Sequence, residues 1–228
     1  MPWTGLSERV KRRDMAHWPK LSPWASLSLC AAVFAVATLV AQWLSLAYGG
    51  AVFVRSTYGA GAWWQLLTSQ WVHFGYLHAL ANAAAMAVVL IVLQGWVDGR
   101  LQCLAMLGGY GGVAAVLALD SHCTVYAGAS GALHGMLAGS AFNLLLRGQP
   151  AVPVPLRRGQ ILGAALLMGL GAKLLAQHLM ASPSEPGWLG IATYYPAHEA
   201  GALGGLVAAW LARGLLHGRR ARPDAEQQ

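Results

Sequence analysis

The sequence predicts an all-α membrane protein, a bundle of six transmembrane helices. Of its 228 residues, 57% are hydrophobic and only 10% are charged, and the mean hydropathy is +0.49. These values exclude an ordinary soluble domain that buries a single apolar core. The chain also contains several apolar runs of about 20 residues, the length that crosses a hydrocarbon core of roughly 30 Å.

The apolar runs define a membrane domain at 25–216, between a basic N-terminal tail at 1–24 and a C-terminal tail at 217–228. Five runs have spanning length, at about 25–48, 77–97, 101–119, 161–180 and 198–216. A shorter one covers about 130–146, so we expect its first residue to lie below the membrane surface. The first run is longer than a signal-peptide core, and we expect it to be a retained helix.

Positive charge orients the bundle. All but two of the 15 lysines and arginines precede the first predicted helix or follow the second, fourth or sixth. These are Arg9, Lys11, Arg12, Arg13, Lys20, Arg100, Arg147, Arg157, Arg158, Arg213, Arg219, Arg220 and Arg222. The positive-inside rule therefore predicts that both termini are cytoplasmic. The isoelectric point of about 9.7 reflects this topology, so no nucleic-acid partner is expected.

A serine between glycines opens the short fourth helix. Residues 128–135 read Gly-Ala-Ser-Gly-Ala-Leu-His-Gly. Small neighbours allow close approach to the Ser130 hydroxyl, and the first turn of a helix offers unpaired N–H groups to an oxyanion. Ser130 is therefore a candidate nucleophile. Taken alone, a serine in a glycine-rich membrane helix is more often a packing residue bonded to its own backbone.

Other polar side chains fall at the same predicted depth. His78 and Asn82 are four residues apart, so they project from one helix face and can donate to a single point. His198 begins the sixth helix, at about the depth of Ser130. Such groups are costly inside a membrane and mark candidate functional sites, although a lone histidine or asparagine is often structural. Lys173, inside the fifth run, is expected to snorkel or to face a water-filled pocket.

Glycine spacing predicts which helices meet. Glycines four residues apart form a face of small residues that lets another helix approach closely. Such faces lie at Gly131, Gly135 and Gly139 on the fourth helix and at Gly201 and Gly205 on the sixth. Their contact would bring His198 toward Ser130. A serine beside a neutral histidine is the minimum for nucleophilic acyl transfer. Glu199 is not expected to orient that histidine, because adjacent helical residues point about 100° apart.

Together these residues resemble the rhomboid family of intramembrane serine proteases, over roughly residues 60–216. Gly128-Ala129-Ser130-Gly131 is similar to the family's Gly-x-Ser-Gly, which implies Ser130 as the nucleophile. Ala197-His198 followed by Gly201 and Gly205 is similar to its Ala-His-x-x-Gly-x-x-x-Gly, which implies His198 as the base of a Ser-His dyad.

A third motif, His73, His78 and Asn82, is similar to the family's His-x4-His-x3-Asn. It implies that His78 and Asn82 join the backbone N–H of Ser130 in an oxyanion hole, while His73 is structural. Two positions depart from the family pattern. Trp64-Gln65 stands in place of a Trp-Arg pair, and His134 stands where many rhomboids carry a tyrosine that stacks on the catalytic histidine.

The form Gly-x-Ser-Gly-x-Leu-His-Gly and the compact six-helix body resemble the rhombosortase branch. That resemblance implies a multi-pass protein of a bacterial inner membrane, with its active site open to the periplasmic or extracellular side. Its expected partners are the lipid bilayer and transmembrane-anchored substrates that carry a C-terminal Gly-Gly motif, a transmembrane helix and a basic end.

Other functions remain open. Transfer of the cleaved peptide to an amine would use the same residues as hydrolysis. A catalytically inactive relative could bind transmembrane clients, although such proteins are expected to lose Ser130 or His198. Neither a metal nor another cofactor is expected, because the histidines are accompanied by no carboxylate or thiolate set and no His-Glu-x-x-His motif. The three cysteines have no paired spacing and predict no disulfide framework.

Overall fold

The computed structural model describes residues 23–146, 156–180 and 193–220. Most of the predicted tails, and the loops at 147–155 and 181–192, lie outside the described residues. The six long helices predicted from the apolar runs are present. They are α2 (Pro23–Tyr48), α5 (Tyr76–Leu93), α6 (Gly99–Leu119), α7 (Ser130–Leu145), α8 (Leu156–Met180) and α9 (Pro196–Arg220). The second helix ends at Leu93 rather than near 97, because Gly95 turns the chain with a φ of 71°.

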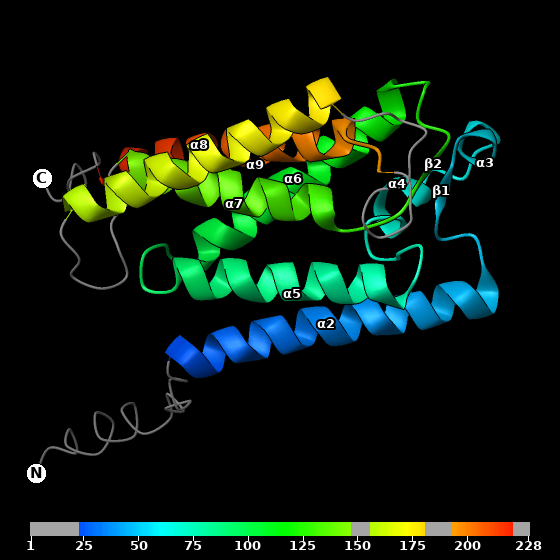
Figure 1. Ribbon diagram of the computed structural model, residues 1–228, viewed down its shortest axis with the longest axis horizontal. Coiled ribbons are helices and arrows are strands. Elements are labelled where there is room, and N and C mark those ends of the chain that lie inside the picture. Colours follow the sequence, from blue (N-terminus) through cyan, green and yellow to red (C-terminus); the bar gives the residue numbers. More distant parts are fainter. Residues whose placement is uncertain (1–22, 147–155, 181–192, 221–228) are drawn as a thin grey trace, which may run out of the picture.

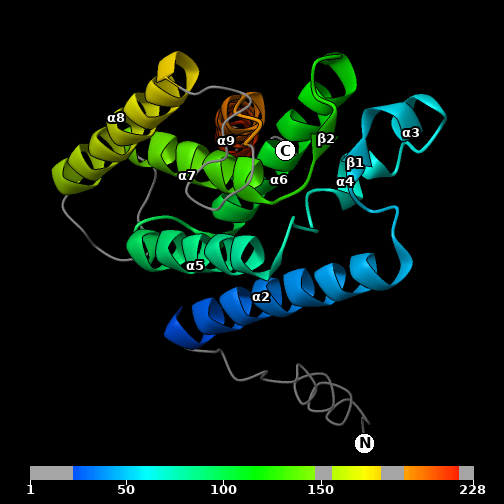
Figure 2. The same cartoon turned by 45° about the vertical axis from the view of Figure 1, so that its right-hand side comes forward.

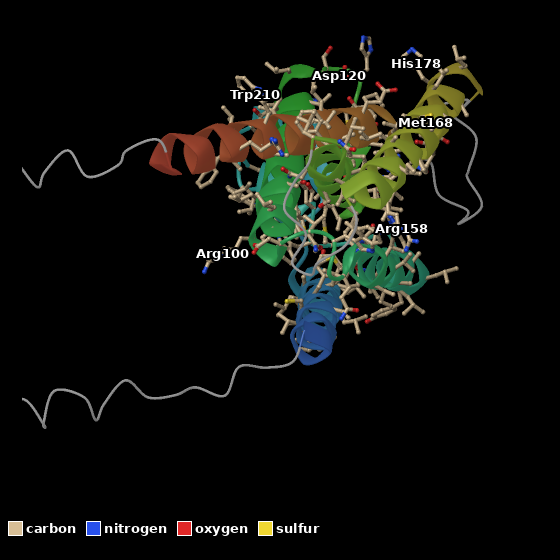
Figure 3. All side chains as sticks on the ribbon, turned by 90° about the vertical axis from the view of Figure 1, so that its left-hand side faces the viewer. Arg100, Asp120, Arg158, Met168, His178 and Trp210 are labelled. Atoms are coloured by element: carbon tan, nitrogen blue, oxygen red, sulfur yellow. The ribbon has the colours of Figure 1, made fainter. Side chains whose placement is uncertain are left out.

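Three of these helices are long and apolar enough to cross a membrane, judged on the described residues alone. They cover Tyr76–Leu93, Gly99–Leu119 and Arg158–Leu179. The first helix contributes a shorter apolar stretch, Cys30–Leu46. Large apolar side chains are exposed on the outer faces, for example Met168 at 69% and Trp210 at 63% (Figure 3). Lipid would cover such a surface. The predictions of six membrane spans and of cytoplasmic termini stay predictions.

Helix α7 lies at the centre of the bundle. It packs against α6 and α9 on one side and α8 on another, while α2 lies along α5 (Figures 1 and 2). Its residues are mostly buried, and they include the three glycines of its small face. One core cluster joins α2, α5, α6 and α7 through Phe34, Met86, Leu90, Met106, Leu133 and Met136. The first residue of α7 is therefore held in a packed environment.

The connections at one end of the bundle carry short strands and short helices that the apolar runs do not predict. Strand β1 (Phe53–Val54) pairs antiparallel with β2 (Val125–Tyr126), and α3 (Arg55–Gly59) and α4 (Gln65–Thr68) lie beside them (Figure 1). The all-α prediction holds for this mostly helical fold; the sequence does not predict the strand pair, because two-residue strands leave no alternation to display. The starts of α5, α7 and α9 face this same end (Figure 1).

Two side chains fasten these short elements to the bundle. The Arg55 guanidinium donates to the carbonyl oxygens of Leu117, at 2.6 Å, and of Asp120 and Cys123, which lie at the end of α6 and just beyond it. The buried Gln65 amide oxygen accepts from the backbone N–H of Val54 at 3.1 Å. Both contacts give otherwise unpaired backbone groups a partner, so the loop end of the bundle is ordered.

Candidate active site

Ser130 is the first residue of α7 and comes two residues after Gly128, whose backbone has a positive φ. Gly128 has a φ of 131°, and a Cβ there would lie 2.8 Å from the His78 ring. Only glycine meets both conditions without strain. The chain can therefore turn sharply into the helix and present the Ser130 side chain and the unpaired N–H groups of the first turn to the same space.

Hydrogen bonds fix the loop before Ser130. The Gly128 N–H donates to the carbonyl of Ser69 at 2.9 Å, and the Tyr126 hydroxyl donates to the carbonyl of Gly128 at 2.9 Å. The Ala129 N–H points to His73 Nε2 at 3.4 Å. Burial, together with the neighbouring His78, lowers the pKa of His73 to about 3. The His73 ring is therefore neutral and keeps a lone pair for this N–H.

His198 lies in the first turn of α9, with only 6% of its surface exposed. Its Nε2 is 2.8 Å from Ser130 Oγ. A histidine at this distance can accept the hydroxyl proton directly. The structure therefore brings together the two residues that the sequence pairs as nucleophile and base.

Glycines let α7 and α9 approach closely enough for this contact. A Cβ at Gly201 would lie 2.5 Å from the carbonyl carbon of Gly131, and a Cβ at Gly205 would lie 2.5 Å from Cα of Gly135. Neither position leaves room for a side chain, since both neighbours are backbone. The glycine faces read from the sequence are thus the surfaces through which these two helices meet.

His134 stacks on His198. The two ring centroids are 4.3 Å apart and the planes are inclined by 12°. His134 Nδ1 lies 2.6 Å from the carbonyl oxygen of Ser130, so the same ring also contacts the backbone of Ser130. This is the stacking position that the sequence assigns to His134.

Helix α8 brings two polar side chains to the site, Lys173 and Gln177. From the sequence alone, Lys173 is assigned no role in the site and Gln177 is not identified. Lys173 Nζ lies 2.7 Å from His134 Nε2 and 3.2 Å from Gln177 Oε1. Gln177 Oε1 lies 3.2 Å from His198 Nδ1. Their signal in the sequence is an amide and an amine one helical turn apart in an apolar run.

Asn82 and Ser130 line one cavity of about 380 Å³, between α5, α7 and α8. The Asn82 amide donates one N–H to the carbonyl of His78 at 3.0 Å and has a second N–H to offer. The His78 ring lies edge-on to His73, with centroids 4.8 Å apart, and faces Gly128. Asn82 therefore faces the space beside Ser130, whereas His78 contacts the loop that precedes Ser130.

Two further contacts involve residues next to the site, Glu199 and Gln42. Glu199 pairs with His178 of α8 at 3.0 Å, in agreement with the expectation that it does not orient His198. Gln42, buried in α2, accepts from the backbone N–H of His73 at 2.7 Å. Sequence reasoning missed Gln42, although an amide inside an apolar run is itself a signal. In the described part of the chain, no three His, Cys, Asp or Glu side chains gather as metal ligands would.

The Rhomboid domain family matches residues 60–214, which include every residue of this site from His73 to Gly205. The chain belongs to the rhomboid family. It is similar to RHOMBOID-like protein 1 of Arabidopsis thaliana, with 36% identity over 85 residues, 36% of this chain and 21% of that protein. It is also similar to RHOMBOID-like protein 7 of Arabidopsis thaliana, with 33% identity over 106 residues, 45% of this chain and 31% of that protein. The matches thus span less than a third of these relatives.

Membership of the rhomboid family makes this chain an integral membrane protein related to intramembrane serine proteases. It also gives a context to the Trp64-Gln65 departure. Gln65 binds Val54 and the Thr57 hydroxyl, the latter at 2.9 Å, and so joins α4 to β1 and α3. The neutral amide of Gln65 therefore holds the parts of the first loop together, at the position where the family pattern has an arginine.

Proposed function

We propose that this rhomboid protein is an intramembrane serine endopeptidase that cleaves transmembrane-anchored proteins near the outer membrane face. The observation that carries the proposal is the 2.8 Å contact between Ser130 Oγ and the buried His198 Nε2. A packing serine would need no imidazole partner, and a structural histidine would not need to face the start of a glycine-bounded helix.

In the proposed reaction, His198 takes the proton of Ser130 while Oγ attacks the substrate carbonyl. The negative charge on the carbonyl oxygen is stabilised by the Ser130 N–H and the free amide N–H of Asn82, with His78 as a further donor. His198 then protonates the leaving amine, and an ester remains on Ser130. Water completes hydrolysis, and an amine in its place would give transpeptidation.

The cavity beside Ser130 supports a membrane-embedded substrate. Its lining is largely apolar and comes from α5, α7 and α8, including Ala85, Leu133 and Leu166. Helix α8 approaches α7 tightly at Gly163, where a Cβ would lie 2.6 Å from the carbonyl of Ala141, but Gly169 borders open space. An apolar chain entering between these helices would reach the nucleophile without passing through water.

We further propose rhombosortase-like specificity, for proteins that end in a Gly-Gly motif, a transmembrane helix and basic residues. The support is the sequence of residues 128–135 together with the crowded, glycine-lined start of α7. A glycine pair in the substrate would fit such a site better than bulky residues. The same proposal includes a bacterial inner membrane, cytoplasmic termini and a site that opens to the periplasmic side.

The competing function is client binding without catalysis. It requires the apolar cavity but gives no reason for the contact between Ser130 and His198. Labelling of the purified protein with a serine-reactive fluorophosphonate separates the two functions, because it needs no known substrate. We expect labelling of the wild type and none of Ser130→Ala or His198→Ala. Full labelling of either variant, or none of a well-folded wild type, would contradict the peptidase.

A further inference from the structure

Lys173 and Gln177 lie on the face of α8 that packs on the bundle. Leu166 of this face packs on a core with Leu93 of α5 and Leu144 of α7, and Leu170 and Leu174 belong to a core shared with α7 and α9. Leu175 and Leu179, on the opposite face, are exposed. A face of this kind normally carries apolar residues throughout. Gln177 is half-buried there and Lys173 is exposed toward the surface that lipid would cover, so an amide and an amine at these positions are costly unless they find polar partners.

Their partners form a closed circuit with one consistent set of donors. A carbonyl oxygen only accepts, so His134 Nδ1 must donate to Ser130, and its Nε2 is left to accept from the Lys173 ammonium. The Gln177 oxygen likewise only accepts, from Lys173 and from His198 Nδ1–H. A neutral His198 with its proton on Nδ1 presents the lone pair of Nε2 to the Ser130 hydroxyl.

We propose that Gln177 is a positioning residue of the Ser130–His198 dyad, and that Lys173 in turn positions Gln177. The inference rests on the proposed function and extends it, because a dyad by itself leaves the second ring nitrogen without an assigned partner. The amide oxygen selects the Nδ1–H tautomer and holds the ring plane. It also stabilises the imidazolium that forms when the serine proton is transferred, as a third residue does in a triad.

Among the residues that the structure describes, the other groups around His198 do not meet this need. His134 contacts the ring by its face, and Tyr195 lies 6.2 Å away between ring centroids. The Glu199 carboxylate is engaged by His178. An alternative role for Gln177 is to solvate Lys173 one turn away, in which case its contact with His198 would be dispensable.

Gln177→Met tests this proposal because it keeps the length of the side chain and removes the acceptor. We expect the fluorophosphonate inactivation rate constant to fall roughly 10- to 100-fold, the effect of losing a hydrogen bond to a charged group. The probe concentration for half-maximal rate should not change. Gln177→Glu retains an acceptor oxygen and should restore the rate. Gln160→Met is the matched control on the same helix, since Gln160 contacts Leu145 at the other end of α8.

Imidazole nitrogen NMR provides a readout that does not depend on activity. The His198 signal, assigned by its loss in His198→Ala, should show the proton on Nδ1 in the wild type and a shift toward Nε2 in Gln177→Met. An unchanged tautomer, or a wild-type inactivation rate in Gln177→Met, would overturn the proposal. A wild type that never labels, but whose His198 tautomer responds to Gln177→Met, would refute the peptidase and support the positioning contact.

Discussion

Gly201→Ala tests whether helix approach sets the dyad geometry. The new Cβ would lie 2.5 Å from the carbonyl carbon and 3.0 Å from Cα of Gly131, whereas ordinary contacts begin at 3.4 Å. Since both groups are backbone, α7 and α9 must separate by about 1 Å. Ser130 precedes Gly131 and His198 lies one turn before Gly201, so their 2.8 Å contact would lengthen to nearly 4 Å, beyond the reach of proton transfer.

We expect fluorophosphonate labelling of Gly201→Ala to fall by at least about 100-fold, the lower range of general-base catalysis. Overpacking should cost about 1–3 kcal/mol of unfolding free energy, offset by up to about 1 kcal/mol from the better helix propensity of alanine. Gly111→Ala is the matched control, because a Cβ at Gly111 of α6 meets open space. It should label normally and melt no lower than wild type. Wild-type labelling of folded Gly201→Ala, recovered by size exclusion, would show that the contact between Ser130 and His198 does not depend on the close approach of α7 and α9.

Three further predictions concern residues around the dyad. Asn82→Ala should lower the labelling rate by roughly 10- to 1,000-fold through loss of an oxyanion donor, and an unchanged rate would remove Asn82 from the hole. His134→Tyr preserves ring stacking and should label within about tenfold of wild type, whereas a loss as complete as in His198→Ala would make His134 part of proton transfer. The Tyr194 hydroxyl donates to the Asp120 carboxylate and holds the pKa of that carboxyl below its ordinary value of 3.8. This hydrogen bond therefore stabilises the fold at neutral pH, and the stabilisation is lost in acid as Asp120 is protonated. Tyr194→Phe should accordingly lower the melting temperature by about 2 °C at pH 7 and by less as the pH falls below 3.8, and a constant difference would contradict this.

Local sequence patterns predict the long helices and the start of α7. Each long helix follows from an apolar run, because hydrocarbon thickness and backbone hydrogen bonding act on a segment without reference to its neighbours. The start of α7 at Ser130 follows from the glycines beside it. The end of α5 was misplaced because Trp96 and Val97 are apolar but follow the turn at Gly95, where backbone conformation and not hydropathy ends the helix.

The contacts of Gln177 could not be read from local patterns. Gln177 precedes His198 by 21 residues and lies on another helix, so its role depends on how α8 is rotated relative to α9. The pairing of β1 with β2 is similar, since residues far apart in the chain meet only after the bundle forms. Gln65 shows the same limit, because its partners are set by the folding of the first loop.

From the amino-acid sequence alone one can infer a membrane protein, the approximate positions of its six long helices, and the serine and histidine that are candidates for pairing. Spacing within one helix decides which side chains share a face, and this is a local property. The packing of the helices is what places Ser130 Oγ 2.8 Å from His198 Nε2 and brings Gln177 of α8 to the other nitrogen of that ring. The first contact depends on the close backbone approach of Gly131 and Gly201, and the second on how α8 lies beside α9, so both exist only when the helices pack together.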